Sequence, residues 1–242
     1  MSGDLIVAVP SKGRLKDQVE AWLADCGIPL RISGGARGYL ATLQGTPGVQ
    51  VRLLSAGDIA EALSAGEIHL GVTGEDLLRE TGPGMEARIL LLRALGFGRA
   101  DLVVAAPKSW LDVDGMADLE EVAHDYLART GRRMRVATKY LAQTRGFFAR
   151  HGVVDYRIAE SGGATEGAPA AGAAEVVVDI TTTGATLADN GLKILSDGVI
   201  LKSQAQLAAS ITADWDADAR RSCEKLLAKL NEDWPALAAQ LP

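Results

Sequence analysis

The stretch Glu175–Leu192 reads EVVVDITTTGATLADNGL, and it decides the fold class. Its β-branched apolar run is typical of a strand buried on both faces of a parallel sheet. Thr181–Gly184 then form a short polar loop, and ATLADNGL begins like a helix, with Asn-Gly as a stop signal. We therefore predict a strand, a hydroxyl-rich loop and a helix N-terminus, as in an α/β sheet.

The loop and the strand end carry groups that suit a sugar phosphate. Backbone N–H groups, threonine hydroxyls and a helix N-terminus all attract a phosphate dianion. Asp179 ends the strand, where open α/β sheets bind ligands, and its carboxylate suits two vicinal sugar hydroxyls. The pattern predicts a ribose 5-phosphate site. The alternative is a purely structural strand and turn, with Asp179 hydrogen-bonded locally.

The preceding stretch, 160–173, reads ESGGATEGAPAAGA and combines small residues with two carboxylates, Glu160 and Glu166. Small residues permit close approach of a ligand to the backbone. The glycines at 167 and 172 have Walker A spacing, but Ala173 and Ala174 replace the required Lys and Ser/Thr. No GxGxxG follows a strand either, so the sequence lacks both common nucleotide fingerprints.

Composition limits the function classes. The chain has 242 residues, 48% of them hydrophobic, and a net charge of −6, which argues against a nucleic-acid binder with a general basic face. Two distant cysteines predict reduced thiols and a cytoplasmic protein, and three isolated histidines predict no protein-held metal site. No stretch is typical of a signal peptide or membrane span.

Cations mark a second candidate loop near the N-terminus. A predicted strand, Leu5–Val9, leads into a helix whose start carries Lys12 and Arg14. Cations oppose the dipole at a helix N-terminus, so a bound anion would explain them, whereas the alternative is two solvated side chains. Arg37, in a glycine-rich turn, is a further candidate phosphate contact.

Strands and helices alternate along the chain with two crossovers. This order predicts an α/β fold that is bilobal, with two open α/β domains similar to periplasmic binding proteins of type II. We predict that domain I comprises 1–97 plus 193–242, ending in a helical segment over 213–241. Domain II, 98–192, would carry the threonine loop.

Several segments together resemble one enzyme family. GGATEGAP followed by AEVVVDITTTGATLADNGL resembles the phosphoribosyl-diphosphate (PRPP) signature of the ATP phosphoribosyltransferases. Further segments follow in the family's order over about 4–205, namely VPSKGRL, GVTGEDLL, FGRADLVVAAP and VATKYLAQTRGFF. Two positions depart from the family's pattern, since Ser55 stands where an Arg is usual and Leu141 where a Pro is common.

The resemblance implies a reaction. The enzyme would transfer the 5-phosphoribosyl group of PRPP to N1 of ATP and release diphosphate, the first step of histidine biosynthesis, with Mg²⁺ carried by the substrates. It would be a short-form catalytic subunit, a homo-oligomer (a dimer) acting with a histidyl-tRNA-synthetase-like regulatory subunit. The rival hypothesis is a non-catalytic bilobal sensor of a small phosphorylated metabolite.

The resemblance also implies site residues. Asp179, Lys12 and Arg14 are the expected catalytic residues, acting by positioning and by stabilising the departing diphosphate. The expected PRPP contacts are Gly163, Glu166, Asp179, Thr181, Thr182, Thr183, Gly184, Ala185 and Thr186. The expected ATP or diphosphate contacts are Lys12, Arg14, Arg37, Arg99, Lys139 and Arg145.

Overall fold

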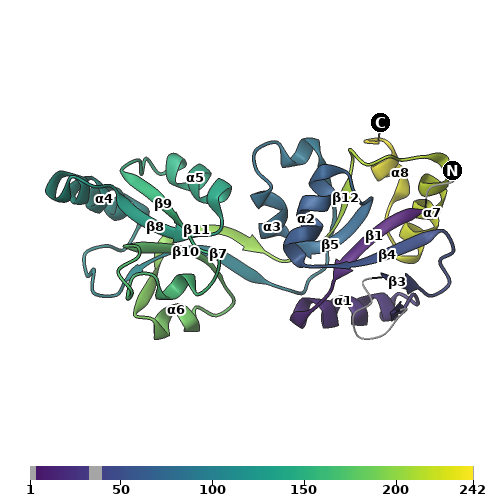
Figure 1. Ribbon diagram of the computed structural model, residues 1–242, viewed down its shortest axis with the longest axis horizontal. Coiled ribbons are helices and arrows are strands. Elements are labelled where there is room, and N and C mark those ends of the chain that lie inside the picture. Colours follow the sequence, from purple (N-terminus) through teal and green to yellow (C-terminus); the bar gives the residue numbers. More distant parts are fainter. Residues whose placement is uncertain (1–3, 33–39, 242) are drawn as a thin grey trace. The chain divides into compact units, whose positions relative to one another are not determined.

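The structure, a computed structural model, describes residues 4–32 and 40–241. The chain forms two compact units, each with its own sheet (Figure 1). The first unit comprises Met1–Gly98 and Gln204–Pro242, and the second comprises Arg99–Ser203. Two open α/β units confirm the predicted fold class.

The first unit is built on a seven-stranded sheet with the order β2-β3-β4-β1-β5-β12-β6. Its strands are β1 (Leu5–Pro10), β2 (Leu30–Ile32), β3 (Leu40–Leu43), β4 (Val49–Leu54), β5 (Leu70–Gly74), β6 (Ile89–Ala94) and β12 (Ala205–Ser210). Its helices are α1 (Gly13–Asp25), α2 (Ala56–Ala65), α3 (Glu75–Glu80), the 3₁₀ turn η1 (Met85–Ala87), α7 (Ala217–Lys229) and α8 (Trp234–Ala238). Because β4, β1 and β5 are parallel, their carboxyl ends lie at one edge.

The helical segment predicted over 213–241 is interrupted. Asn231 adopts a left-handed backbone conformation with φ 57°. The Glu232 N–H returns to the Leu227 carbonyl at 2.9 Å, which closes α7 before α8 begins. The apolar residues of this segment join the core of the first unit with β1, and the buried ones include Trp215, Leu226, Leu227 and Leu230.

A buried histidine connects three segments of the first unit. His69 precedes β5, and its Nδ1 accepts the N–H of Ile6 in β1 at 3.0 Å. Its Nε2 lies 3.0 Å from the carbonyl of Asp214, and its ring meets the edge of Trp215 with centroids 4.8 Å apart. Since Nδ1 accepts and Nε2 faces a carbonyl, the ring is a neutral imidazole with its proton on Nε2.

The second unit is built on a five-stranded sheet with the order β11-β7-β10-β8-β9. Its strands are β7 (Ala100–Pro107), β8 (Met134–Thr138), β9 (Tyr156–Glu160), β10 (Val176–Thr181) and β11 (Leu192–Ser203). Its helices are α4 (Met116–Thr130), α5 (Leu141–Arg150), the 3₁₀ turn η2 (Thr165–Gly167) and α6 (Ala185–Asp189). Strand β8 runs parallel to both β10 and β9, while β7 runs antiparallel to β10. The valines at 176–178 are fully buried, as the sequence predicts.

The return to the first unit falls later than we predict from the sequence. The segment 193–203, assigned above to domain I, belongs to β11, which pairs antiparallel with β7 from Leu192 to Ser203. These residues complete the second sheet, so the boundary follows Ser203. Among the helices of residues 4–32 and 40–241, none is both long and apolar enough to cross a bilayer.

Candidate functional site

Three parallel strands of the second unit deliver their following loops to one edge. Strands β8, β9 and β10 lead respectively to Lys139, to the segment 161–167 and to the threonine loop. Carboxyl ends of parallel strands are where open α/β sheets bind ligands. The structure therefore brings together, at this carboxyl edge, the PRPP-binding candidates of both loops.

The threonine loop is partly held by its own hydroxyls. Thr181 Oγ1 accepts the N–H of Gly184 at 2.9 Å, and Thr183 Oγ1 accepts the N–H of Ala185 at 3.3 Å. Gly184 has φ 75°, a left-handed conformation that strains other residues. Thr182, Thr183 and most of the helix start are exposed. The loop is thus preformed, and each bonded hydroxyl keeps its own proton to donate outward.

Helix α6 is shorter than its sequence suggests. It spans five residues, Ala185–Asp189, so its dipole is smaller than that of a long helix. The Asn190 N–H bonds to the carbonyls of Thr186 and Leu187, which ends the helix at the predicted Asn-Gly stop signal. The hydroxyls and N–H groups of the loop, more than a helix dipole, are what this site offers a phosphate.

Asp179 is a half-buried carboxylate at this edge. Burial raises the pKa of its side chain, the Ile180 N–H and the nearby Lys139 lower the pKa, and the nearby Glu166 raises it. Its Oδ1 accepts the Ile180 N–H at 2.8 Å, and Oδ2 has no hydrogen-bond partner among the described residues. One acceptor oxygen is therefore held by the backbone, and the other is open to hydroxyl donors.

The segment 161–167 is anchored to the sheet and positions Glu166. The Ser161 N–H bonds to the Thr138 carbonyl at 3.0 Å, and the buried Thr165 donates its hydroxyl to Ser161 Oγ at 3.1 Å. Ala164 lies between them with φ 50°, a left-handed conformation that costs a non-glycine residue energy and is enriched at functional sites. Sequence reasoning missed the anchoring role of Ser161 and Thr165, whose only signal is two hydroxyls within a run of small residues.

Gly163 lies in open space at this segment. A Cβ built there would meet no atom of the described chain within 4 Å, and its backbone is not left-handed. Internal packing therefore gives no reason for a glycine. Close approach of a ligand would supply one.

The predicted cations of the second unit lie at opposite ends of its parallel strands. Lys139 directly follows β8, lies 5.0 Å from the Tyr140 ring centroid and acts on Asp179. Arg99 directly precedes β7, whose Asp101 pairs with Thr181, so Arg99 lies at the same edge. Arg145 instead acts on Tyr156, the first residue of β9, which places it toward the amino end of the strands.

The carboxyl edge of the first unit carries Lys12 and Arg14. Both are exposed, and neither side chain has an ion pair or hydrogen bond within the described part of the chain. Lys12 is the N-cap of α1 and Arg14 is its second residue, and the helix has no side-chain cap and no acidic residue in its first turn. Two cations thus share a thirteen-residue helix N-terminus with unsatisfied N–H groups, which is an arrangement that attracts an anion. Arg37 lies outside the described residues.

The two departures from the family's pattern have local explanations. Ser55 is the N-cap of α2, and its Oγ accepts the Asp58 N–H at 3.2 Å. Leu141 is the first residue of α5, the helix position where proline is most easily tolerated and where it is not required. Neither substitution disturbs its helix.

Comparison with known proteins identifies the family. A family model described as ATP phosphoribosyltransferase matches residues 55–232. The chain belongs to the ATP phosphoribosyltransferase family. Members of this family transfer the 5-phosphoribosyl group of PRPP to N1 of ATP, the first step of histidine biosynthesis, and the rival hypothesis of a non-catalytic sensor is not favoured.

Relatives and solved structures agree with this assignment. The chain is 74% identical to the ATP phosphoribosyltransferase of Caulobacter vibrioides over 94% of its own length and 71% of that relative. It is 57% identical to the enzyme of a Bradyrhizobium species over 94% of the chain and 70% of the relative. Its fold matches the ATP phosphoribosyl transferase (HisG:HisZ) complex from Thermotoga maritima with a TM-score of 0.70 and 25% identity, covering 94% and 96% of the two chains.

A more distant likeness concerns the fold alone. The periplasmic VFT2 domain of Bordetella pertussis BvgS matches with a TM-score of 0.51 and 13% identity, over 94% of this chain and 86% of that one. This similarity agrees with the predicted resemblance to type II periplasmic binding proteins.

Proposed function

We propose that the carboxyl edge of the second unit binds PRPP for the family's phosphoribosyl transfer. The observation that carries this proposal is Asp179, a half-buried carboxylate with one open oxygen beside a preformed hydroxyl loop. A carboxylate next to a phosphate site would repel the phosphate unless it served another part of the ligand. Two vicinal ribose hydroxyls, each a donor, match its open oxygen.

The loop residues take the 5-phosphate in this proposal. The outward O–H groups and remaining N–H groups of residues 181–186 would donate to the phosphate oxygens, as short charge-assisted hydrogen bonds. Gly163 and Glu166 would form the wall beside the ribose, since the pKa of Asp179 responds to Glu166. The proposed PRPP contacts are Gly163, Glu166, Asp179, Thr181, Thr182, Thr183, Gly184, Ala185 and Thr186.

Catalysis rests on positioning in this proposal. The attacking group is the lone pair of adenine N1, so no residue has to remove a proton first. Asp179 would fix the ribose and thereby the anomeric carbon for in-line attack, an effect that can supply several kcal/mol of the barrier. Lys12 and Arg14 would stabilise the negative charge of diphosphate or triphosphate groups.

The remaining cations have supporting roles. Lys139 and Arg99 lie at the carboxyl edge of the second unit and would contact diphosphate or ATP. Arg145 and Arg37 stay predictions of the sequence, the first because of its position near Tyr156 and the second because it lies outside the described residues.

Magnesium would enter with the substrates. Within the described part of the chain, no group of three or more His, Cys, Asp or Glu is placed to hold a metal ion. Mg²⁺ commonly binds one or two carboxylates together with substrate phosphates, and Asp179 with the nearby Glu166 fits that donor set. When bound, the ion would neutralise part of the charge of the departing diphosphate.

We also infer a cytoplasmic enzyme with protein partners. Cys26 and Cys223 are both free thiols, which suits a reducing compartment. The likeness to a HisG:HisZ complex supports a HisZ-like regulatory partner. We propose that this partner resembles histidyl-tRNA synthetase and that the chain itself forms a homodimer. Size measurement of the purified chain, alone and mixed with such a partner, tests both proposals.

An assay with a matched variant tests the proposed site. The purified chain is incubated with ATP, PRPP and Mg²⁺, and product is followed by the absorbance of the N1-substituted adenine. Turnover by the natural chain, with loss of turnover in Asp179→Asn and retention in Asp189→Asn, supports the proposal. Equal turnover in both variants would remove Asp179 from the site, and no turnover by the natural chain would favour the sensor.

A further inference from the structure

A group of arginines lies at the amino end of the second sheet. Arg132 and Arg133 precede β8, Arg135 is its second residue, and Arg157 is the second residue of β9. Arg135 and Arg157 are register partners on adjacent parallel strands, so their side chains leave the sheet on the same face. Together with Tyr126 these four arginines line a cavity of about 70 Å³, here called the arginine pocket.

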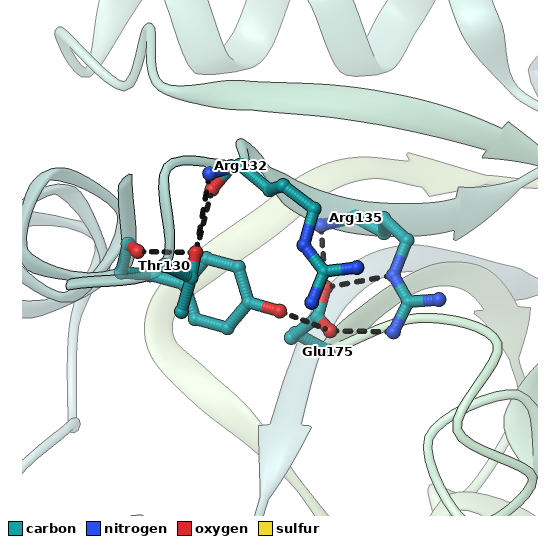
Figure 2. Close-up of polar contacts among 5 residues, drawn as sticks. Thr130, Arg132, Arg135 and Glu175 are labelled. Carbon is teal, nitrogen blue, oxygen red and sulfur yellow. Dashed lines mark hydrogen bonds and ion pairs between the residues drawn. The ribbon is translucent and has the colours of Figure 1, made fainter. Parts of the chain in front are cut away.

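One of the four arginines has a carboxylate partner. Arg135 donates to both oxygens of Glu175, from Nη2 to Oε1 at 2.7 Å and from Nε to Oε2 at 3.2 Å (Figure 2). Elsewhere in the described chain, no carboxylate pairs with Arg132, Arg133 or Arg157. Three exposed arginines without a carboxylate partner therefore line one cavity, in a protein whose net charge is −6.

Glu175 cannot serve the other arginines as well. Besides the two bonds from the Arg135 guanidinium, it accepts the Arg135 N–H at 2.6 Å and the Tyr126 hydroxyl at 3.0 Å. Burial raises the pKa of Glu175, but the hydrogen bonds from Arg135 and Tyr126 outweigh burial and bring the pKa below its usual value. Its two oxygens are thus ionised and already occupied by four donors. In Figure 2 the Arg132 guanidinium lies over this pair without a dashed contact to it.

A cluster of like positive charges favours the binding of an anion. Glu175 offsets the charge of Arg135 but not that of its register partner Arg157, and like charges on adjacent strands destabilise a sheet. Guanidinium groups bind phosphate-type oxyanions through two parallel N–H donors, which lysine cannot do. The Tyr126–Glu175–Arg135 network fixes one wall of the pocket, so the donors do not all have to be ordered on binding.

We propose that the arginine pocket binds a small tetrahedral oxyanion of the phosphate class. The cavity volume suits such an ion, whereas pockets for nucleotide-sized ligands start at roughly 300 Å³. The pocket lies at the amino end of β8 and β9, and the proposed PRPP loops lie at their carboxyl ends. Four residue steps along β8 separate the two edges by about 13 Å, so the pocket is a second, distinct anion site.

The test uses inorganic phosphate as the ligand and a measurement that reports binding residue by residue. Amide resonances of the ¹⁵N-labelled full chain are followed by NMR while phosphate is added at constant ionic strength, with sodium chloride as the matched salt. We expect saturable shifts at residues 132–135 and 157. Arg157→Gln should weaken this binding by about tenfold, because one charged donor is lost. The control Arg150→Gln removes an exposed arginine of the same unit that lies over Phe147, and should leave the binding unchanged.

The outcomes separate the pocket from the other anion site. Shifts that appear equally with sodium chloride would reduce the pocket to general screening and overturn the proposal. Shifts confined to residues 181–186 would assign phosphate to the threonine loop alone and overturn it as well. An Arg157→Gln chain that folds and binds phosphate with unchanged affinity at 132–135 would also overturn it. Retention of the shifts in Thr183→Ala, with their loss in Arg157→Gln, would establish the pocket as independent.

Discussion

The loop after β1 and the loop after β10 offer a phosphate two different kinds of site. The first presents Lys12 and Arg14 at an uncapped helix, with no side-chain hydrogen bond to hold them among the described residues. The second carries no formal charge, but its hydroxyls bond to its own N–H groups and preform its shape. Exposed charges attract over distance and are screened by salt, whereas a preformed loop supplies geometry. We expect the first loop to capture its anion and the second to orient its ligand.

The largest effect should come from a change beside the loop after β10, which we expect to orient the ligand. Asp179→Asn keeps the shape of the side chain and its acceptor for the Ile180 N–H, and removes the anionic acceptor for ribose hydroxyls. Misplacement of the reacting carbon should lower turnover about 100-fold at saturating PRPP and ATP, measured by product absorbance. The same change should also weaken PRPP binding. Unchanged turnover would mean that the second loop holds the phosphate without orienting the sugar.

The loop hydroxyls should give the next largest effect. Thr183→Ala removes one charge-assisted donor to the phosphate, worth roughly 1.5–3 kcal/mol, so calorimetry should show roughly 10- to 150-fold weaker PRPP binding. Thr181→Val should do more, because Thr181 also holds the Gly184 N–H at 2.9 Å. Binding of free ATP should change far less. If Thr183→Ala left PRPP affinity intact, or if both variants unfolded, the loop would be structural.

Changes in the loop after β1, which we expect to capture the anion, should have effects that depend on salt. Arg14→Gln should weaken ATP binding by up to about fivefold at low ionic strength, the range of exposed charge pairs. The defect should fade as salt rises, since the screening length falls to about 3 Å at 1 M. The Thr183→Ala defect should persist across the same salt series. Lys16→Gln is the control, because Lys16 lies on the same helix and pairs with Glu20. An equal salt dependence of the Arg14→Gln and Thr183→Ala binding defects would contradict the proposed difference between the two loops.

The smallest effect concerns stability. Burial raises the pKa of Asp179, so the ionised carboxylate is less favourable in the folded chain than in the unfolded chain. This penalty is present above the folded pKa and is relieved as pH falls through it. Asp179→Asn should therefore unfold at an equal or higher temperature than the natural chain at pH 8, and lose that advantage as the pH falls toward the ordinary pKa of a carboxyl group. Thermal melts across this range that show the opposite slope would contradict a desolvated carboxylate.

The features that depend on local pattern could be predicted from the sequence. The buried strand before Thr181, the short loop that ends at Gly184 and the stop at Asn190 follow from residue types at fixed spacing. The position of Asp179 at the strand end follows in the same way. The meeting of the loops after β8, β9 and β10 follows once the strands are taken as parallel.

The features that depend on contacts between residues distant in sequence could not be predicted from the sequence. No local signal tells that β11 joins β7 in the second sheet, which moved the boundary from 193 to after Ser203. The break at Asn231 depends on a left-handed residue that the helical spacing conceals. Arg145 lies near enough to Tyr156 to offset part of the increase in its pKa that burial causes, and only the packing of α5 on its sheet brings the two together. The arginine pocket gathers residues of two strands and a helix in the same way.

The tautomer of His69 lets one ring link three segments of the first unit that are distant in sequence. Its Nδ1 offers a lone pair to the Ile6 N–H of β1, and its Nε2 faces the Asp214 carbonyl. A side chain that lacked either role would leave a backbone group without its partner in a buried place, where an unsatisfied polar group is costly. Replacing His69 should therefore loosen the contact between β1, β5 and the segment that leads to the C-terminal helices.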